Sequence, residues 1–155
     1  MNELVYRNLS EDAKRQICAW KYGGEYDLYN LPAYEEMQVR QIGFMNPKRK
    51  KNYYGFWDES ILVGFVNILE EKEEVFIGIG VNPDLCNKHY GQRMLLITYE
   101  ISKKLYPDKP LYLEVRTWNI RAVKCYQKAG FRIDGQAYEL TTGIGTGTFY
   151  RMIRE

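Results

Sequence analysis

A short polar stretch between an apolar run and a helical pattern is suited to bind an anion. Residues 75–82, VFIGIGVN, predict a strand, and Pro83 follows them directly. Beyond this loop, residues 90–106 carry apolar side chains at helical spacing. The backbone N–H groups of such a loop, with the N-terminus of the helix, form a site for a diphosphate. Pro83 also indicates that strand pairing is broken here, which frees backbone groups to bond an extended ligand.

A second strand-to-helix segment places an amide and a phenol at fixed positions. Residues 111–117, LYLEVRT, predict a strand, and Asn119 opens a helix that runs to Ala129. Gly130 then occupies the position of a left-handed helix C-cap. Tyr126 lies on this helix. The segment therefore predicts a strand followed by a capped helix that carries Tyr126.

Together the two segments resemble the GNAT acyltransferase superfamily. In that family a bulged fourth strand leads into a diphosphate loop with the pattern Gln/Arg-x-x-Gly-x-Gly/Ala. Here the loop consists of Cys86, Asn87, Lys88, His89, Tyr90 and Gly91. The last glycine matches, whereas a cysteine replaces the Gln/Arg and a histidine replaces the first glycine. We expect His89 to avoid a positive φ or to adopt one at a cost.

The second segment matches the family at more positions. The family pattern is a strand, Asn-x-x-Ala, three residues, Tyr, and then x-Lys-x-Gly-Phe. The residues that fall on it are Asn119, Ala122, Tyr126, Lys128, Gly130 and Phe131. The resemblance covers nearly the whole chain and is strongest over residues 75–135. It implies an α/β fold with a mixed, mostly antiparallel central sheet, helices on both faces, and a splay between the fourth and fifth strands that admits acyl-CoA.

The resemblance also implies which residues bind acetyl-CoA as the acyl donor. These are Ile79, Val81, Cys86, Asn87, Lys88, His89, Tyr90, Gly91, Gln92, Asn119, Ala122 and Tyr126. Residues 86–91 would hold the diphosphate, Val81 would pair with pantetheine through its backbone, and Asn119 would support the pantetheine arm. Tyr126 is the implied general acid, since a phenol with a pKa near about 10 can protonate a leaving thiolate.

The general base is left open by the sequence. The amine must lose a proton to attack, and a backbone N–H near Gly80 or Val81 can stabilise the oxyanion that forms. Glu73 and Glu74 lie at the start of the strand, and Glu74 is roughly 20 Å from Val81 along it. Glu114 lies mid-strand and is closer. A water relay through one of these carboxylates, or through Glu25 or Asp27, and the absence of a dedicated base both remain open.

Residues 20–30, WKYGGEYDLYN, are interpreted as the border of the acceptor pocket. Trp20, Glu25, Asp27 and Tyr29 would line a recess for a cationic amine. The alternative is ordinary packing of a loop or short helix over the sheet. The corresponding alternatives for the other sites are a helix cap at Asn119, a core aromatic at Tyr126, and an inert loop thiol at Cys86.

Composition bounds these interpretations. The 155 residues suit one domain over residues 1–155, and a net charge of +2 argues against a nucleic-acid partner. A single histidine excludes a zinc site with several histidines, and no metal site is predicted. Three widely spaced cysteines without C-x-x-C indicate a reducing compartment. With no signal peptide and no run of about 18 apolar residues, we expect a cytoplasmic protein without a membrane partner.

The remaining elements complete the expected order β-α-α-β-β-β-α-β-α-β-β. Ser10 is the predicted N-cap of the first helix, and Pro32 the predicted start of the second. Further expected features are a first strand at 4–9, helices over 11–20 and 32–42, a basic turn at 47–51, strands at 52–58 and 61–69 joined by Glu59-Ser60, and final strands at 131–140 and 149–155.

The sequence predicts an acetyl-CoA-dependent N-acetyltransferase that acts on a primary amine of a small molecule or peptide. Transfer would be direct, in a ternary complex without a covalent enzyme intermediate. The alternative is a non-catalytic acyl-CoA-binding or sensing module on the same fold, which the altered loop and the missing base favour. A homodimer is left open, by analogy with relatives that pair through terminal strands.

Overall fold

The computed structural model describes residues 3–155, which form a mixed α/β fold. Its strands are β1 (Val5–Asn8), β2 (Tyr53–Asp58), β3 (Ile61–Glu70), β4 (Val75–Val81), β5 (Leu111–Arg116), β6 (Arg132–Ile133), β7 (Tyr138–Thr142) and β8 (Gly145–Arg154). The α-helices are α1 (Glu11–Ala19), α2 (Tyr34–Arg40), α3 (Tyr90–Leu105) and α4 (Ile120–Lys128). Short 3-10 helices are η1 (Gly24–Tyr29), η2 (Gly43–Met45), η3 (Lys50–Asn52) and η4 (Pro83–Leu85).

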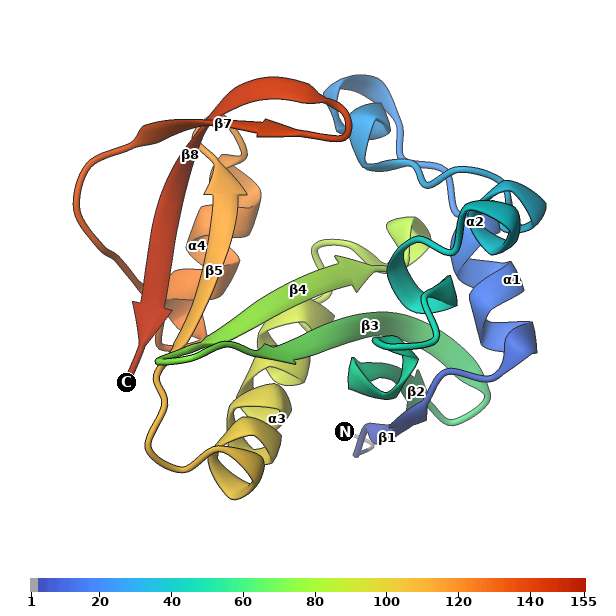
Figure 1. Cartoon of the computed structure of the whole chain (residues 1–155), viewed down its shortest axis with the longest axis horizontal. Helices are drawn as coiled ribbons and strands as arrows, with labels where there is room; N and C mark the ends of the chain where they lie inside the picture. The colour runs from blue at the N-terminus through green and yellow to red at the C-terminus, as the bar shows by residue number, and fades with distance from the viewer. Residues whose placement is uncertain (1–2) are drawn as a thin grey trace. The chain divides into compact units, whose positions relative to one another are not determined.

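The strands are hydrogen-bonded in the order β1-β2-β3-β4-β5-β8-β6, and β7 pairs with β8 (Figure 1). Pairing is antiparallel for β1 with β2, β2 with β3, and β8 with its three partners. β4 and β5 pair in parallel, through Val75–Leu111 and Phe76–Tyr112. This pairing covers the first two residues of β4, whereas β4 continues to Val81. The mixed, mostly antiparallel sheet is confirmed, while the splay stays a prediction.

The chain divides into two compact units. The first unit contains the described residues up to Asn67 together with Ile79–Tyr90. The second unit contains Ile68–Gly78 and Gly91–Glu155. A single domain over residues 1–155 stays a prediction.

The first unit packs α1 and α2 against β2 and β3. Ser10 caps α1 as predicted, because its hydroxyl oxygen accepts the Ala13 N–H at 3.1 Å. Apolar residues on the inner faces of these elements form a core of Ala13, Ile17, Cys18, Tyr34, Met37, Phe44, Tyr53, Trp57 and Leu62. Burying each large side chain contributes about 1.5–3 kcal/mol, so this core holds the unit together.

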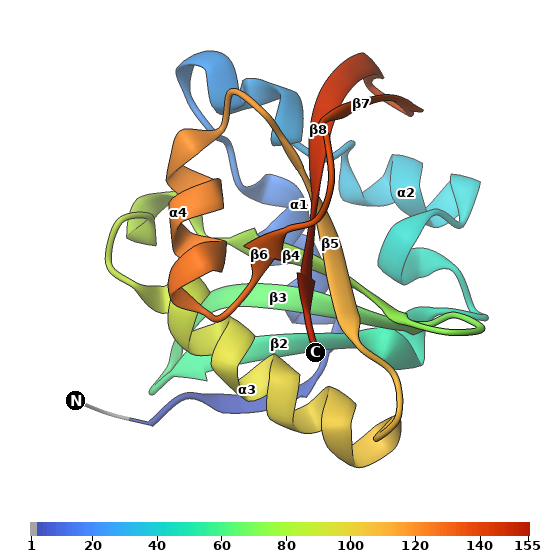
Figure 2. The same ribbon diagram turned by 90° about the vertical axis from the view of Figure 1, so that its left-hand side faces the viewer.

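The second unit is built on the antiparallel pair β5 and β8, and Figure 2 shows α4 alongside it. Because side chains alternate along a strand, the pair presents two different faces. The apolar face buries Leu111, Leu113 and Val115, together with Met152 opposite Leu113. The other face carries Tyr112, Glu114 and Arg116 of β5. On β8, Arg151 lies opposite Glu114 and Phe149 lies opposite Arg116.

Three sequence-based boundaries were wrong. Residues 131–140 do not form one strand, since β6 ends at Ile133 and β7 begins at Tyr138. Gly135 between them has φ of +78°, a left-handed conformation that a continuous strand does not accept. β8 also begins at Gly145, four residues before the strand expected at 149–155. The added residues are glycines and threonines that pair with β7. The second helix begins at Tyr34, two residues after Pro32.

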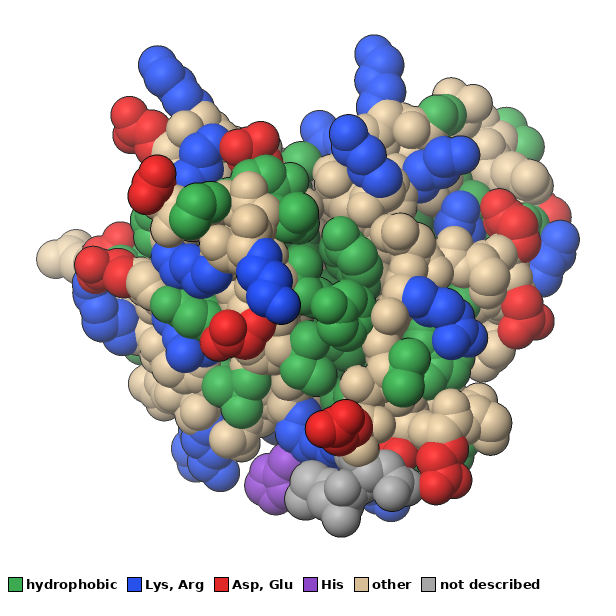
Figure 3. All heavy atoms as spheres, turned by 90° about the horizontal axis from the view of Figure 1, so that it is seen from below, with side chains coloured by type: hydrophobic (Ala, Val, Ile, Leu, Met, Phe, Trp, Pro, Cys, Tyr) green, Lys and Arg blue, Asp and Glu red, His purple; other side chains and the backbone are tan. Residues whose placement is uncertain are grey.

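Surface charge is mixed in sign. On the face shown in Figure 3, Lys and Arg side chains are interspersed with Asp and Glu side chains. This distribution agrees with the small net charge of +2.

Candidate functional site

The loop between β4 and α3 is anchored by Asn82. Its backbone N–H donates to the Val63 carbonyl at 2.8 Å, and its amide nitrogen donates to the Leu62 carbonyl at 3.2 Å. Its side-chain oxygen accepts the Asp84 N–H at 3.0 Å, which caps η4. The side chain of one residue therefore ties the start of the loop to β3 and turns the chain away from the sheet. This explains why the strand ends here, before Pro83.

The loop contains two non-glycine residues in the left-handed conformation. Asn87 has φ of +67° and His89 has φ of +66°. His89 therefore adopts a positive φ at a cost, which is one of the two outcomes that the sequence left open. Asn and His are among the side chains that tolerate this region best, and the cost is of order 1–2 kcal/mol per residue. The loop therefore keeps a backbone shape that glycine favours although two side chains oppose it, and such strain collects at functional sites.

Tyr90 and Cys86 fasten the far end of the loop. The Tyr90 hydroxyl donates to the Asp58 carboxylate at 2.5 Å, which connects the first residue of α3 with the end of β2. The Cys86 thiol donates to the Asn82 carbonyl at 3.7 Å, within the loop itself. Asn87, Lys88 and His89 are exposed. A strained, anchored loop with exposed tips can present amides to an anion.

Val81, the last residue of β4, is held from an unexpected direction. Its carbonyl accepts a hydrogen bond from the Tyr22 hydroxyl at 2.6 Å, and the Tyr22 N–H donates to the Asn30 side chain at 2.6 Å. A carbonyl oxygen has two lone pairs, so Val81 can accept a second hydrogen bond. The predicted acceptor segment and the predicted pantetheine-pairing residue are therefore in direct contact within the first unit.

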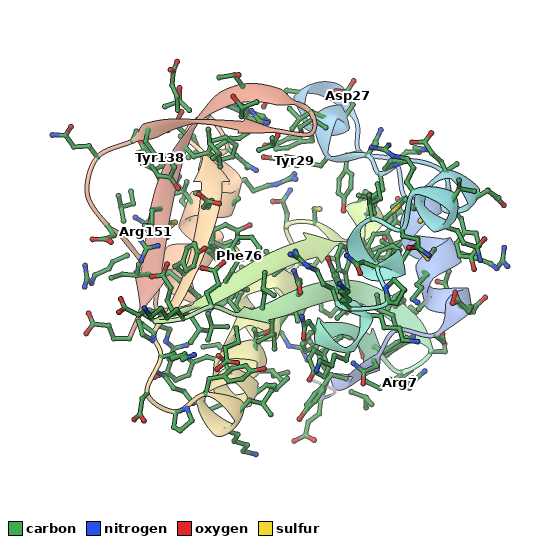
Figure 4. The ribbon with its side chains drawn as sticks, in the orientation of Figure 1. Arg7, Asp27, Tyr29, Phe76, Tyr138 and Arg151 are labelled. Carbon is green, nitrogen blue, oxygen red and sulfur yellow. The ribbon has the colours of Figure 1, made fainter. Side chains whose placement is uncertain are left out.

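The residues predicted to line the acceptor pocket differ in their surroundings. Trp20 lies against the Phe65 ring, with centroids 6.3 Å apart, and packs on the apolar core of the first unit. Glu25 and Asp27 are exposed on η1, and Tyr29 is half-buried at its end (Figure 4). The contacts of Trp20 favour its structural role, while the two carboxylates are available to a cationic ligand.

Asn119 has the capping role that was the alternative to ligand binding. Its side-chain oxygen accepts the Ala122 N–H at 3.2 Å at the start of α4, and the residue is buried. Its own N–H donates to the Arg116 carbonyl at 3.0 Å. The cap uses one of the two lone pairs of the amide oxygen, so capping α4 and bonding pantetheine are compatible roles for this side chain.

Tyr126 is half-buried on α4, together with Ala122. The helix ends as predicted, because Gly130 has φ of +96° and the Phe131 N–H returns to the Tyr126 carbonyl at 3.0 Å. The other residues implied to bind acetyl-CoA flank these segments. Ile79 lies half-buried on β4, while Gly91 is buried and Gln92 half-buried in the first turn of α3.

The carboxylates considered as general bases have different partners. Arg151 donates to both oxygens of Glu74, at 3.0 and 2.6 Å, and to Asp134 at 3.2 Å. These hydrogen bonds raise the pKa of Arg151 above its ordinary value. Glu74 is therefore bound to a permanent cation, whereas Glu73 is exposed in the turn before β4. Neither is arranged to accept a proton from an amine.

Glu114 instead accepts the hydroxyl of Tyr138 at 2.5 Å, from β7 (Figure 4). Burial of the phenol, and then its hydrogen bond to Glu114, raise the pKa of Tyr138. Tyr138 thus stays protonated and donates to Glu114. Tyr112, on the same face of β5, donates in the same way to Glu71 at 2.8 Å.

The structure brings together pairs that sequence reasoning missed. These are Tyr22 with Val81, Tyr90 with Asp58, and Tyr138 with Glu114. Each joins residues 24 or more positions apart, so no local pattern signals it. Two negative findings apply to residues 3–155. They contain no group of three His, Cys, Asp or Glu side chains arranged to hold a metal ion, and no helix there has the length and apolarity to cross a membrane.

Comparison with known families decides the relationship that these features indicate. Residues 10–131 match the family model described as Acetyltransferase (GNAT) family. The chain belongs to the GNAT acetyltransferase family. The matched region begins at the N-cap of α1 and ends just after α4, so it includes both strand-to-helix segments.

Solved structures of GNAT enzymes share the fold. Spermidine N-acetyltransferase from Vibrio cholerae, solved with CoA and spermine, has a TM-score of 0.77 at 18% identity and covers 97% of this chain and 94% of its own. A GNAT-family acetyltransferase from Bacillus anthracis has a TM-score of 0.76 at 18% identity, over 98% and 94% of the two chains. AAC(6')-Ib, solved with ribostamycin and coenzyme A, has a TM-score of 0.73 at 16% identity, over 99% and 93%. No curated protein sequence matches the chain.

Proposed function

We propose that the protein is an acetyl-CoA-dependent N-acetyltransferase acting on a primary amine of a small molecule or a peptide. The observation that carries the proposal is the loop at residues 82–89, which keeps two left-handed residues, Asn87 and His89, without glycine. Maintaining such strain next to the N-terminus of α3 is consistent with selection for a loop that presents its amides to a diphosphate. Membership of the GNAT acetyltransferase family supplies the donor class.

In this proposal, acetyl-CoA supplies an acetyl thioester and the chain's own residues bind it. Backbone N–H groups of residues 86–91 hold the diphosphate, and the backbone of Val81 bonds the pantetheine arm. The Asn119 side chain supports the same arm while its oxygen caps α4. The Tyr126 phenol gives its proton to the thiolate as the acetyl carbon–sulfur bond breaks.

Glu114 is proposed to remove the amine proton, directly or through a water molecule. Of the carboxylates considered, Glu74 is neutralised by Arg151, whereas the partner of Glu114 is the neutral phenol of Tyr138. A hydrogen-bonded phenol orients a carboxylate without supplying a positive charge. Conversion of Glu114 to Gln should lower kcat most at low pH, where the fraction of neutral amine is smallest.

Two structural neighbours were solved in complex with amines: spermine in one structure and ribostamycin in another. At 16–18% identity these relatives support the amine class for this chain rather than either compound. The exposed carboxylates Glu25 and Asp27 are suited to attract a cationic amine.

Calorimetric titration with acetyl-CoA, with free CoA for comparison, tests the proposal. Micromolar binding, followed by thiol release with members of an amine panel, is the expected result. Binding without thiol release from any amine would instead favour an acyl-CoA-binding or sensing module. Absence of binding at millimolar ligand would overturn both functions.

A further inference from the structure

Arg116, the last residue of β5, is a buried cation without an anionic partner. The residue is 9% exposed. Within residues 3–155 its guanidinium donates no hydrogen bond and forms no ion pair, and its one recorded interaction is with the Phe149 ring, 4.8 Å from the guanidinium carbon to the centroid. A guanidinium carries five N–H donors, and burying them without hydrogen-bond acceptors is unfavourable.

The second unit is built to keep this side chain in place. Phe149 lies directly opposite Arg116 in the β5–β8 register and covers the guanidinium. Gly147 lies two residues before Phe149 on β8, at a point where a Cβ atom would collide with Nη1 of Arg116. A glycine at this point of β8 therefore makes room for the guanidinium against the backbone.

Arg151, on β8, provides a comparison, because it is an arginine with carboxylate partners. Its side chain is 30% exposed, yet it forms hydrogen bonds with Glu74 and Asp134. The more buried Arg116 has no such carboxylate. Since an unpaired buried charge is destabilising, a guanidinium kept in this state is best explained by an anionic group that arrives with a ligand.

The position of Arg116 connects it with the proposed reaction. Its carbonyl accepts the N–H of Asn119, the proposed pantetheine residue, at 3.0 Å. Its side chain shares a strand face with Glu114, the proposed base, two residues earlier or about 7 Å along the strand. The face therefore presents a carboxylate and a guanidinium at a spacing that fits the amine and the carboxylate of one acceptor.

We infer that Arg116 determines acceptor specificity by binding a carboxylate that the acceptor carries near its reactive amine, as in an amino acid or a peptide. This inference rests on the proposed function. The other source of an anionic group is a phosphate of acetyl-CoA. The acceptor carboxylate is favoured because residues 86–91 already provide for the diphosphate, and because a planar guanidinium matches a planar carboxylate with two hydrogen bonds.

Matched acceptors that differ only in the carboxylate test the inference. L-lysine and cadaverine form one pair, and glycylglycine and its C-terminal amide form another. In the wild-type protein we expect kcat/KM to be at least about tenfold higher for the carboxylate-bearing member. Arg116→Gln should remove this preference while the KM for acetyl-CoA stays unchanged, and Arg116→Lys should retain part of it. Equal kcat/KM values within both pairs in the wild type would overturn the inference.

A change in the KM for acetyl-CoA in Arg116→Gln, with acceptor preference intact, would also overturn it. That result would assign the guanidinium to a phosphate of the donor. The wild-type comparison of matched acceptors needs no variant, so an unfolded Arg116→Gln would not prevent a decision.

Thermal unfolding gives a readout that does not require turnover. N-acetylglycine should raise the Tm of the wild type, N-acetylglycinamide should not, and neither should raise the Tm of Arg116→Met. If no amine is acetylated but N-acetylglycine alone stabilises the wild type, the anion site stands and the transferase proposal fails. If amines are acetylated but both compounds act equally on Tm and no matched pair is distinguished, the transferase stands and the role of Arg116 fails.

Discussion

The β4–α3 loop and the β5–α4 turn both lead the chain from a strand into a helix, but they keep different features of the family. The first departs from the family at Cys86 and His89 and yet holds Asn87 and His89 in the left-handed conformation. The second keeps the side chains Asn119 and Tyr126 and is capped by Asn119. A loop that binds through backbone amides depends on its shape, whereas a turn that binds through side chains depends on its residues.

The comparison predicts the largest effect for a side chain on α4. Tyr126→Phe should lower kcat by about 100-fold, because the thiolate loses its proton donor. Steady-state thiol release measures this, while calorimetry should show unchanged acetyl-CoA affinity. Tyr99→Phe is a matched control, since it removes a phenol that bonds the Glu155 carbonyl at 2.7 Å, and its kcat should equal that of the wild type. Equal kcat values in all three proteins would assign Tyr126 to packing.

Asn119 allows capping and ligand binding to be separated. Asn119→Ala should lower the free energy of unfolding by about 1 kcal/mol through loss of the cap, and should also raise the KM for acetyl-CoA. Asn119→Ser keeps a cap oxygen but lacks the amide nitrogen. In that variant Tm should stay near the wild-type value while KM rises. A KM that follows Tm in both variants would mean that Asn119 is only a cap.

For the first loop, removing its anchor should matter more than changing its exposed side chains. Tyr90→Phe should lower the free energy of unfolding by about 1 kcal/mol, since it leaves the Asp58 carboxylate without this hydrogen bond. We expect the KM for acetyl-CoA to rise about fivefold if the anchor shapes the loop. In the Tyr90→Phe background, Asp58→Asn should lower the free energy of unfolding by less than it does in the wild type, because the two residues share one interaction. Additive losses would show that they act separately.

The smallest effect is predicted for His89→Gly. Glycine removes a left-handed strain of order 1 kcal/mol but adds a similar entropy to the unfolded chain, so Tm should change little. Acetyl-CoA affinity should be equal or slightly higher, since the backbone shape is retained. His89→Val is the contrasting variant, because a β-branched residue is a genuine outlier at this φ. If valine leaves calorimetric affinity unchanged, the left-handed shape of the loop is not what binds the donor.

Features that depend on neighbouring residues were predictable from the sequence. Helix caps at Ser10 and Asn119, the left-handed Gly130, and the turn between β2 and β3 each follow from local preferences, and all are confirmed. The interrupted stretch at 131–140 was not predictable in this way. Its residue types favour a strand, but pairing with β8 stops after Ile133 and resumes at Tyr138.

The sequence by itself determined the elements, the family resemblance and the candidate residues, since periodicity, caps and motif spacing act over a few positions. Only the tertiary structure decided which charges are neutralised. Glu74 meets Arg151 across 77 positions and Tyr22 meets Val81 across 59, while the Arg116 guanidinium forms no ion pair within the described residues of the second unit. For the residues on paired strands, such as Arg116 and Arg151, the partner depends on strand register, because a shift of one residue would move the side chain to the opposite face of the sheet.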